Sequence, residues 1–412
     1  MSPPLCRFCR TPLVHTFVDL GRQPLANSYP TPEQLAAGTE PAYPLHARVC
    51  EACFLVQVDD AVPAEAIFDG GYAYFSSFSA SWVEHARRYA EAMTARFNLG
   101  PESLVIEVAS NDGYLLQHFV ARDIPVLGIE PAANTAEAAR ARGVPTEVRF
   151  FNEDTGRDLA ARGLRADLMA ANNVLAHVPD IGAFVAGFPH ALKDEGVLTF
   201  EFPHLLNLIE QVQFDTIYHE HFSYLSLLTV EQVLAANGMR VFDVELLPTH
   251  GGSLRLFCAR ASSGHEETEA LRALRAREAA AGLGDLDTYG GFTPRVEAVR
   301  ESFRAFLATA KAQGKRIAAY GAAAKGNTFL NYCGASAADI VAAFDANPAK
   351  QGRFLPGSHV PILAPDQVAK VRPDYVLILP WNLKDEIMGQ LAFIRDWGGR
   401  FVTASPETRV LS

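Results

Sequence analysis

The chain has 412 residues, 49% of them hydrophobic, so it is long enough to form two or three domains with a full core in each. Its formal net charge is −11 and its basic residues form no runs, which argues against a nucleic-acid partner. The first residues lack a basic and then apolar leader, and no apolar stretch approaches the roughly 18 residues of a membrane span. We therefore expect a globular cytoplasmic protein with reduced thiols, no membrane contact and no obligatory protein partner.

Two Cys-x-x-Cys pairs stand near the N-terminus, Cys6 with Cys9 and Cys50 with Cys53. Each pair can direct two thiolates at one ion, and two pairs complete a closed tetrahedral site, which predicts a structural zinc ion. Residues 10–49, rich in proline and glycine, should form hairpins and loops around the metal. Redox chemistry is the alternative, but neither pair opens a βαβ unit.

Residues 68–80 gather aromatic, glycine and hydroxyl residues just before a helical pattern over 81–97. Apolar packing accounts for Phe68 and Phe78, whereas the tyrosines and serines would need polar partners if buried. The segment is interpreted either as a lid or substrate wall, which includes Tyr72, or as a plain helix-capping loop.

The central motif is an apolar strand over 105–108 that runs into a small-residue turn, with a helix expected to open at Gly113. A second strand over 124–129 ends in an acid, at the spacing of a nucleoside-binding βαβ unit. The dinucleotide fingerprint Gly-x-Gly-x-x-Gly is absent, which favours S-adenosylmethionine (SAM) over NAD; a strand-turn without ligand is the alternative. The predicted cofactor residues here and on the next strand are Glu107, Ala109, Asn111, Asp112, Gly113, Tyr114, Leu115, Glu130, Pro131, Asn134, Asn172 and Asn173.

The alternation of strands and helices continues through residue 204, as a doubly wound α/β sheet requires. A helix is expected over 132–142, a short strand over 145–151, and strands over 166–171 and 196–204. Their C-terminal ends carry polar residues on the crevice side. Among these, His177 is either a substrate contact or a loop histidine, and Glu201 and His204 are candidate substrate contacts.

Residues 214–224 carry the densest chemistry of the chain. If the backbone is extended, Tyr218 and Glu220 lie on one face and His219 and His221 on the other. In a loop this alternation of side chains would not hold. The tight spacing lacks the His-x-x-x-His geometry of a helical metal site. A general base oriented by an acid and a phenol fits better. The alternative is a loop in which these polar side chains only form hydrogen bonds with one another.

Residues 265–312 are rich in alanine, glutamate and arginine and should form helices that bridge two domains. A second α/β pattern then begins near residue 315, with a small-residue turn that opens a helix. We predict a phosphate-accepting site there, in which the cations would hold a diphosphate. The alternative is a packing module with ordinary surface cations. The candidate substrate residues of this part are Lys325, Asn327, Lys350 and Arg353.

Taken in chain order, these motifs resemble the SAM-dependent deoxysugar C-methyltransferases. The resemblance spans the chain and is carried by the two cysteine pairs and by residues 105–113, 173–180, 218–221, 250–253 and 320–327. It implies a zinc-binding N-terminal domain, a central SAM domain and a C-terminal Rossmann-like domain, with a dTDP-sugar held between the last two. The expected boundaries are 1–66, 67–260, 261–312 for a helical linker, and 313–412.

The resemblance also implies a reaction, the addition of a methyl group to carbon 3 of a dTDP-linked 4-keto-6-deoxysugar in antibiotic sugar pathways. Carbon 3 has no lone pair, so a base must first remove its proton to give an enolate. By resemblance His221 is that base, with Glu220, Tyr218 and Tyr72 around it. The donor to the enolate oxygen stays open among Tyr72, Tyr218 and His177.

Two other functions are compatible with parts of the sequence. The C-terminal glycine turn could serve a nicotinamide-dependent sugar-nucleotide oxidoreductase, although the fingerprint is missing. A non-catalytic zinc-and-SAM-binding module that recruits a partner is the third reading.

Overall fold

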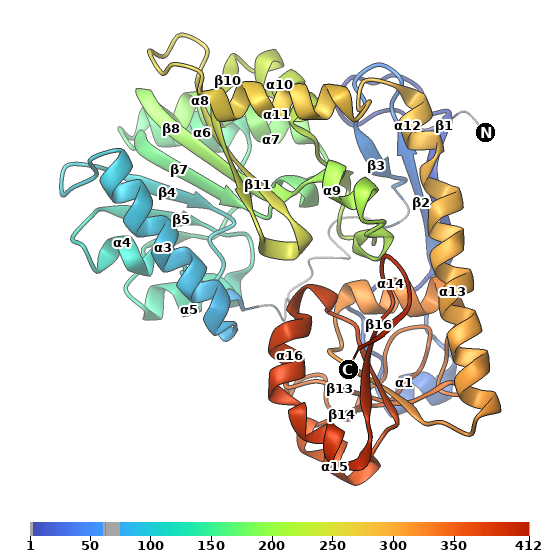
Figure 1. The fold of residues 1–412 in the computed structure, drawn as a ribbon. Coiled ribbons are helices and arrows are strands. Elements are labelled where there is room, and N and C mark those ends of the chain that lie inside the picture. Colours follow the sequence, from blue (N-terminus) through green and yellow to red (C-terminus); the bar gives the residue numbers. More distant parts are fainter. Residues whose placement is uncertain (1–2, 61, 63–74, 412) are drawn as a thin grey trace.

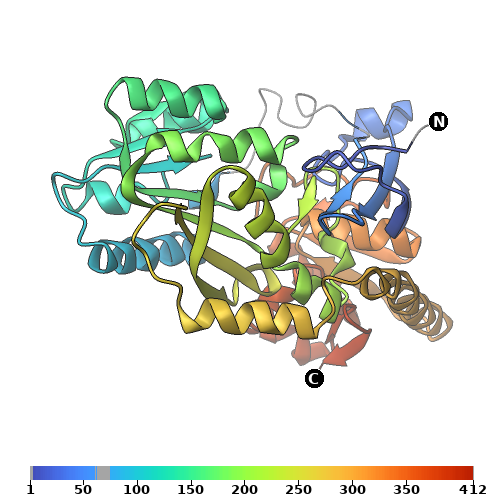
Figure 2. The ribbon, with the colours of Figure 1, turned by 90° about the horizontal axis from the view of Figure 1, so that it is seen from above.

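The computed structural model describes residues 3–60, 62 and 75–411. It contains three β-sheets, one near each end of the chain and one in the middle (Figure 1). Seen from above, the central sheet lies on one side and the N-terminal strands on the other, with the C-terminal sheet beneath (Figure 2). Among the described residues no helix has the length and apolar character that crossing a bilayer requires.

The N-terminal sheet is antiparallel, with strand order β1-β2-β3-β9. The short helix α1, whose Thr31 and Gln34 form a capping box, lies between β1 and β2. The expected hairpins around the cysteines are thus present, but β9 comes from beyond residue 220 and completes this sheet. The elements are β1 (His15–Gln23), α1 (Pro32–Ala37), β2 (Tyr43–Val49), β3 (Val56–Val58) and β9 (Ser223–Tyr224).

The central sheet has seven strands in the order β10-β11-β8-β7-β4-β5-β6. Strands β4 to β8 are parallel, while β11 runs antiparallel to both β8 and β10. The strand order reverses its direction between β4 and β7, and open α/β sheets bind their ligands at such a point. The strands are β4 (Val105–Val108), β5 (Val126–Ile129), β6 (Thr146–Glu147), β7 (Ala166–Asn172), β8 (Leu192–Pro203), β10 (Met239–Leu247) and β11 (Ser253–Arg260).

Helices cover the central sheet, and one of them differs from expectation. The helix that we expected to open at Gly113 begins only at Gln117 and is one turn long, because residues 110–113 turn sharply first. The helices here are η1 (Ser76–Phe78), α3 (Ala80–Arg96), α4 (Gln117–Val120), α5 (Ala133–Ala141), α6 (Glu153–Ala161), η2 (Leu175–His177), α7 (Ile181–Ala186), α8 (Phe188–Ala191), α9 (Leu205–Glu210), η3 (Phe214–Thr216), α10 (Leu227–Ala236) and η4 (Thr249–Gly251).

Three helices bridge to the C-terminal sheet, as the composition predicts; they are α11 (Glu269–Ala280), α12 (Leu286–Gly290) and α13 (Phe292–Ala312). The sheet has the order β14-β13-β12-β15-β16-β17 and is parallel except for β17. Its elements are β12 (Ile317–Tyr320), α14 (Ala324–Cys333), β13 (Ile340–Phe344), β14 (Ile362–Leu363), η5 (Pro365–Gln367), α15 (Val368–Val371), β15 (Tyr375–Ile378), η6 (Trp381–Leu383), α16 (Lys384–Gln390), η7 (Ala392–Trp397), β16 (Arg400–Thr403) and β17 (Arg409–Leu411).

The N-terminal part packs against both other parts. Its sheet shares one hydrophobic core with α13 and the C-terminal sheet, where the rings of Phe17 and Phe292 stack with centroids 4.4 Å apart. Its cysteine turns join the core of the central sheet instead. The N-terminal domain therefore fixes the other two domains relative to each other, since burial of apolar surface favours both contacts.

Candidate active site

The four N-terminal cysteines converge as the sequence predicts. Their Sγ atoms all lie within 4.8 Å of one another. The Sγ–Sγ distances are 3.4 Å for Cys9 and Cys50 and 3.6 Å for Cys6 and Cys53. A tetrahedral zinc ion with Zn–S bonds of about 2.3 Å would separate its sulfurs by about 3.8 Å, so the thiols fit this metal.

The turn after β4 is shaped by backbone conformation. Ala109, Asn111 and Gly113 have φ values of 57°, 49° and 77°. A Cβ atom on Gly113 would lie 3.0 Å from Cγ2 of Val144, so the chain needs glycine there. The backbone N–H of Asn111 donates to Oε2 of Glu130 over 2.8 Å, which ties the turn to the end of β5.

Two carboxyl groups line this turn. Glu130 accepts a second hydrogen bond, from the N–H of Ala132 at 2.8 Å, and each of its oxygens keeps a lone pair for a ligand. Glu107 is buried, and among the described residues neither of its carboxyl oxygens has a hydrogen-bond partner. Burial raises the pKa of the Glu107 carboxyl well above its usual range, and it also raises the pKa of Glu130. An unpartnered buried acid fits a ligand that carries an ammonium or hydroxyl group.

The side chains of Asn111 and Asp112 are held by protein partners. The N–H of Ser76 donates to Oδ1 of Asn111 over 2.9 Å, and the hydroxyl of Ser77 donates to Asp112. Asp112 is fully buried and also forms an ion pair with Arg142 at 2.8 Å. Its carboxylate therefore secures residues 76–77 over the turn, and its role in cofactor binding stays a prediction. Tyr72, which we predicted to belong to a lid or substrate wall in segment 68–80, lies outside the described residues.

The other predicted cofactor residues occupy the same edge of the sheet. Tyr114 and Leu115 are buried, and Leu115 contributes its side chain to the hydrophobic core. Pro131 and Asn134 flank the start of α5. Asn172 and Asn173 follow β7, and their Oδ1 atoms are buried without a hydrogen-bond partner among the described residues. These two amides offer acceptors to a ligand.

Residues 218–221 form a turn and not a strand, so the alternate-face arrangement does not hold. The N–H of His221 donates to the carbonyl of Tyr218 over 2.9 Å, which closes the turn. The hydroxyl of Tyr218 lies 2.8 Å from Nε2 of His221, and Nδ1 of His221 lies 3.0 Å from the carbonyl oxygen of Thr216. Because that carbonyl can only accept, Nδ1 carries the proton and Nε2 presents its lone pair to the phenol.

His221 lies beside the end of the parallel sheet. The centroid of its ring lies 4.7 Å from the ring centroid of His177, which follows β7. Burial lowers the pKa of His221 well below its usual range, and it lowers the pKa of His177 to about 4. Both imidazoles are therefore neutral at neutral pH. A pocket lined by His221, Thr216, Tyr224 and apolar residues adjoins this pair.

Glu220 points to a different partner from His221. Both of its carboxyl oxygens accept from Nδ2 of Asn27, at 2.8 and 2.9 Å. Burial raises the pKa of Glu220, which the Asn27 amide opposes. His219 turns toward the N-terminal sheet, where its Nε2 lies 3.1 Å from the carbonyl oxygen of Pro44.

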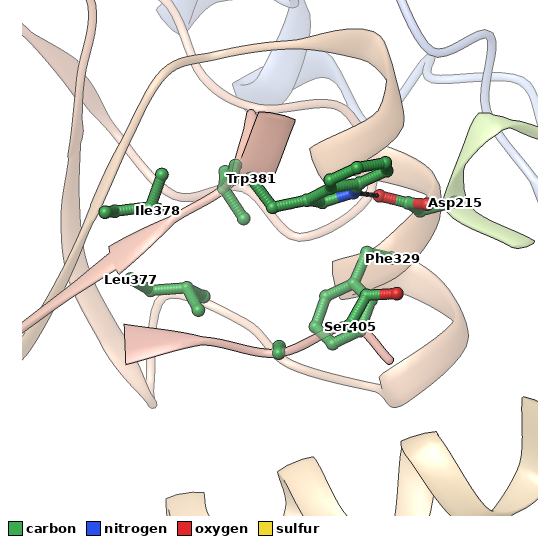
Figure 3. Close-up of a pocket in the computed structure, with 8 residues that line it drawn as sticks. Asp215, Phe329, Leu377, Ile378, Trp381 and Ser405 are labelled. Carbon is green, nitrogen blue, oxygen red and sulfur yellow. Dashed lines mark hydrogen bonds between the residues drawn. The ribbon is translucent and has the colours of Figure 1, made fainter. Parts of the chain in front are cut away.

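A buried charge cluster connects this segment to the C-terminal domain. Nε1 of Trp381 donates to Oδ2 of Asp215 over 2.6 Å, at the edge of a small cavity (Figure 3). The ammonium of Lys325 lies 4.5 Å from the centroid of the Trp381 ring and 2.7 Å from Oδ1 of Asn382. Burial raises the pKa of Asp215 to about 6 and lowers the pKa of Lys325.

The other predicted cations lie around Tyr29 from the N-terminal domain. Nζ of Lys350 donates to the carbonyl of Ala322 over 2.7 Å and sits 4.9 Å from the Tyr29 ring centroid. Arg353 is exposed and donates to the carbonyl of Tyr29 over 3.2 Å. Lys325 and Lys350 thus border the turn at residues 320–325, and Arg353 lies beside Tyr29; their role toward a diphosphate stays a prediction.

Three predicted substrate residues are instead committed to buried partners. Glu201 pairs with Arg255 and with His85, at 2.8 and 2.9 Å. His204 pairs with Glu278 at 2.7 Å. Asn327 donates to the carbonyl of Ala26 over 2.7 Å. Among the described residues Nδ1 of His204 and Oδ1 of Asn327 have no hydrogen-bond partner, so the substrate assignment of these three residues stays a prediction.

Sequence reasoning missed three residues that the structure brings to this region. His250 has a φ of 54° and a pKa lowered by burial to about 4, and its ring lies 5.4 Å from that of Trp82. Its place in a His-Gly-Gly-Ser motif was the available signal. Asn27 and Asp215 carried no such signal, because their partners are distant in sequence.

Comparisons with known proteins agree with this arrangement. Three family models match: a zinc binding domain over residues 6–68, a methyltransferase domain over 82–244 and a C-methyltransferase C-terminal domain over 248–406. The chain is 36% identical to the C-methyltransferase NovU of Streptomyces niveus over 407 residues, which cover 99% of this chain and 96% of NovU.

More distant relatives cover less than half of the chain. A ubiquinone biosynthesis O-methyltransferase of Rhodopseudomonas palustris is 25% identical over 33% of this chain and 62% of its own. The structure of magnesium protoporphyrin IX methyltransferase from Synechocystis with bound SAH covers 43% of this chain and 83% of its own. Its identity is 16% and its TM-score 0.35.

The match to NovU extends over nearly all of both chains, so the expected enzyme class is confirmed, and the oxidoreductase and non-catalytic readings are set aside. The expected cofactors, SAM and a structural zinc ion, are confirmed with it, and Glu107, Glu130 and the four thiols are suited to hold them. This chain belongs to the SAM-dependent C-methyltransferases that carry a zinc-binding N-terminal domain.

Proposed function

We propose that the enzyme methylates carbon 3 of a dTDP-linked 4-keto-6-deoxysugar, with His221 as the base that removes the carbon-bound proton. The observation that carries this assignment is the geometry of His221. Its Nδ1 faces the Thr216 carbonyl and its Nε2 faces the Tyr218 hydroxyl, at 3.0 and 2.8 Å. This arrangement keeps Nε2 unprotonated, with its lone pair accepting from the Tyr218 hydroxyl, so the carbon-bound proton would reach Nε2 through that hydroxyl or once the hydroxyl turns to the substrate. A positioned base contributes roughly 10²–10⁴-fold to a rate.

The neighbours of His221 support a proton transfer. Proton uptake would create an imidazolium in a buried site. We assign the balance of that charge to Glu220, the preceding residue in the chain, whose carboxyl accepts from Asn27. The Tyr218 hydroxyl can donate to the developing enolate oxygen or relay the proton to Nε2. His177 and Tyr72 remain the other candidates for the oxyanion donor.

We assign the methyl donor to the crevice between β4 and β7. SAM supplies an electrophilic sulfonium methyl group when it is bound. Glu130 has lone pairs for the ribose hydroxyls, Glu107 can accept from the cationic end of the donor, and the amides of Asn172 and Asn173 offer further acceptors. Residues 76–77 cover the turn after β4 and would shield the bound methyl donor from water.

We assign the sugar nucleotide to the C-terminal domain, between it and the SAM domain. Lys325 and Lys350 border the turn after β12 and Arg353 contacts Tyr29, and these cations could balance a diphosphate in a chain of net charge −11. The domain boundaries at residues 66, 260 and 312 and a cytoplasmic location remain predictions.

Substitution of His221 by Asn tests the base. We expect H221N to bind SAM normally but to lose wash-in of solvent deuterium at carbon 3 of the keto-sugar, together with methylation. Nuclear magnetic resonance of the sugar follows the exchange, and H190N, at a histidine paired with Glu153 on the surface, is the control. Undiminished exchange and methylation in H221N would remove His221 as the base.

A further inference from the structure

Residues 26–30 form a short loop of the N-terminal domain that is bound to the C-terminal domain along its length. The carbonyl of Ala26 accepts from buried Asn327 at 2.7 Å, and the Tyr29 hydroxyl donates to the carbonyl of Ala322 over 2.6 Å. The carbonyl of Pro30 accepts from the N–H of Phe354 at 3.0 Å. Contacts at both ends leave the loop little freedom relative to the C-terminal domain.

Asn27 extends from this loop to the opposite side of the site. Its Nδ2 donates to both oxygens of Glu220, at 2.8 and 2.9 Å, across 193 residues of sequence. A donor held on a rigid loop fixes the orientation of the carboxylate that accepts from it. The amide is itself exposed, so burial of an apolar core does not explain its place.

A second contact anchors the same catalytic turn to the C-terminal domain. The hydroxyl of Thr328 in α14 donates to the carbonyl of Ile217 over 3.1 Å. The turn at 218–221 is thus held from the C-terminal side at its backbone by Thr328 and at its acidic side chain by Asn27. Both contacts depend on the C-terminal domain being in place.

We propose that Asn27 is a positioning residue that orients Glu220 for the proton transfer, through a loop fastened to the C-terminal domain. The inference rests on the proposed function, because it gives Glu220 a role beside His221. It makes the N-terminal domain a contributor to the active site, and not only a scaffold around zinc. Asn27 need not touch the substrate, since it acts on the carboxylate.

The test compares N27A with S28A, which alters the neighbouring exposed residue. We expect N27A to lower kcat about 10- to 100-fold, the value of one hydrogen bond to a charged group, with KM for SAM within about twofold of wild type. N27D, of the same size, should lose at least as much, because it sets a second carboxylate against Glu220. Zinc content and melting temperature identify any variant that has misfolded, and N27D then replaces N27A.

A double-mutant cycle with E220Q separates positioning from a general structural effect. If Asn27 acts through Glu220, N27A added to E220Q should cost less than about twofold. An equal loss in both backgrounds, or kinetics of N27A that match S28A, would overturn the proposal. Crystal structures of wild type and N27A give an independent answer: a displaced Glu220 carboxylate supports it, and an unchanged one contradicts it. Full deuterium exchange in H221N would reject the proposed base without altering these readings of Asn27.

Discussion

The turns after β4 and β12 are held by the same kind of backbone hydrogen bond, but the side chains around them carry opposite charges. In the central sheet the N–H of Asn111 donates to Glu130 at the end of the next strand, at 2.8 Å. In the C-terminal sheet the N–H of Ala322 donates to Asp345 in the equivalent place, at 2.7 Å. Both turns are therefore secured by an acid that the neighbouring strand delivers.

The side chains around the two turns differ. The first turn faces the buried, unpartnered acid Glu107, whereas the second is bordered by Lys325 and Lys350. The backbone of a Rossmann-like turn creates a place for a ligand, and the local charges select which ligand enters. An acid-lined turn suits a cationic, hydroxylated donor, and a cation-lined turn suits a diphosphate.

Removal of the acid from the first turn should have the largest effect. We expect E130A to weaken SAM binding about 100-fold, because the ribose hydroxyls and the N–H groups of Asn111 and Ala132 lose their acceptor. Affinity for dTDP should not change. Isothermal titration with each ligand measures both, with the exposed E137A as control. Equal weakening of both ligands would show that the turns are not independent sites.

Removal of a cation from the second turn should reverse this pattern with a smaller effect. We expect K325A to weaken dTDP binding about 10-fold and to leave SAM binding unchanged. The loss should shrink as salt is raised, since part of the attraction is screened. K384A, at an exposed lysine of α16, is the matched control. A K325A variant that binds dTDP as wild type does would place the nucleotide elsewhere.

The histidines between the two turns should make stability depend on pH. The pKa of His177 and that of His250 lie at about 4 in the folded chain, against about 6.5 when unfolded. Below pH 6.5 the unfolded chain takes up protons that the folded chain does not, so stability falls from about pH 6.5 to 4. Urea unfolding should show H250N losing about 1–3 kcal/mol less than wild type over this range. Identical losses in the two proteins would mean that His250 is protonated without cost.

Replacement of the acid in each turn by its amide should change the affinity for SAM and that for dTDP in opposite directions, with the smallest effect of the set. D345N keeps an acceptor for Ala322 but removes a negative charge 4.0 Å from Nζ of Lys350. We expect dTDP to bind about twofold more tightly, because a partly buried pair at this distance is weak. E130Q should weaken SAM binding instead. Changes of the same sign in both titrations would contradict the charge argument.

Local patterns sufficed to predict much of the fold. The strands that begin at Val105, Ala166 and Tyr375 consist mostly of apolar residues, which is typical of buried parallel strands. The two Cys-x-x-Cys pairs were enough to predict that the four thiols meet, because this spacing is typical of a zinc site. The carboxyl ends of these strands then indicated where Glu107 and Glu130 meet.

The remainder depends on partners that are remote in sequence. Pairing of β9 with β3 and the bond from Asn27 to Glu220 join residues that no local pattern connects. Burial of Glu201 follows from an ion pair with Arg255 that forms only when β11 inserts next to β8. The sequence left open whether residues 218–221 are extended or form a loop, because their alternating residues imitate the period of a strand.

Mass spectrometry of the product tests whether the enzyme transfers a methyl group to a keto-sugar. The enzyme is incubated with SAM and a small panel of dTDP-linked 4-keto-6-deoxysugars, and fragmentation locates any added methyl group. We predict that at least one sugar gains a single methyl at carbon 3 with wild type and none with H221N. Methylation at an oxygen or nitrogen atom, or no transfer to any keto-sugar by an enzyme that binds SAM, would contradict the account.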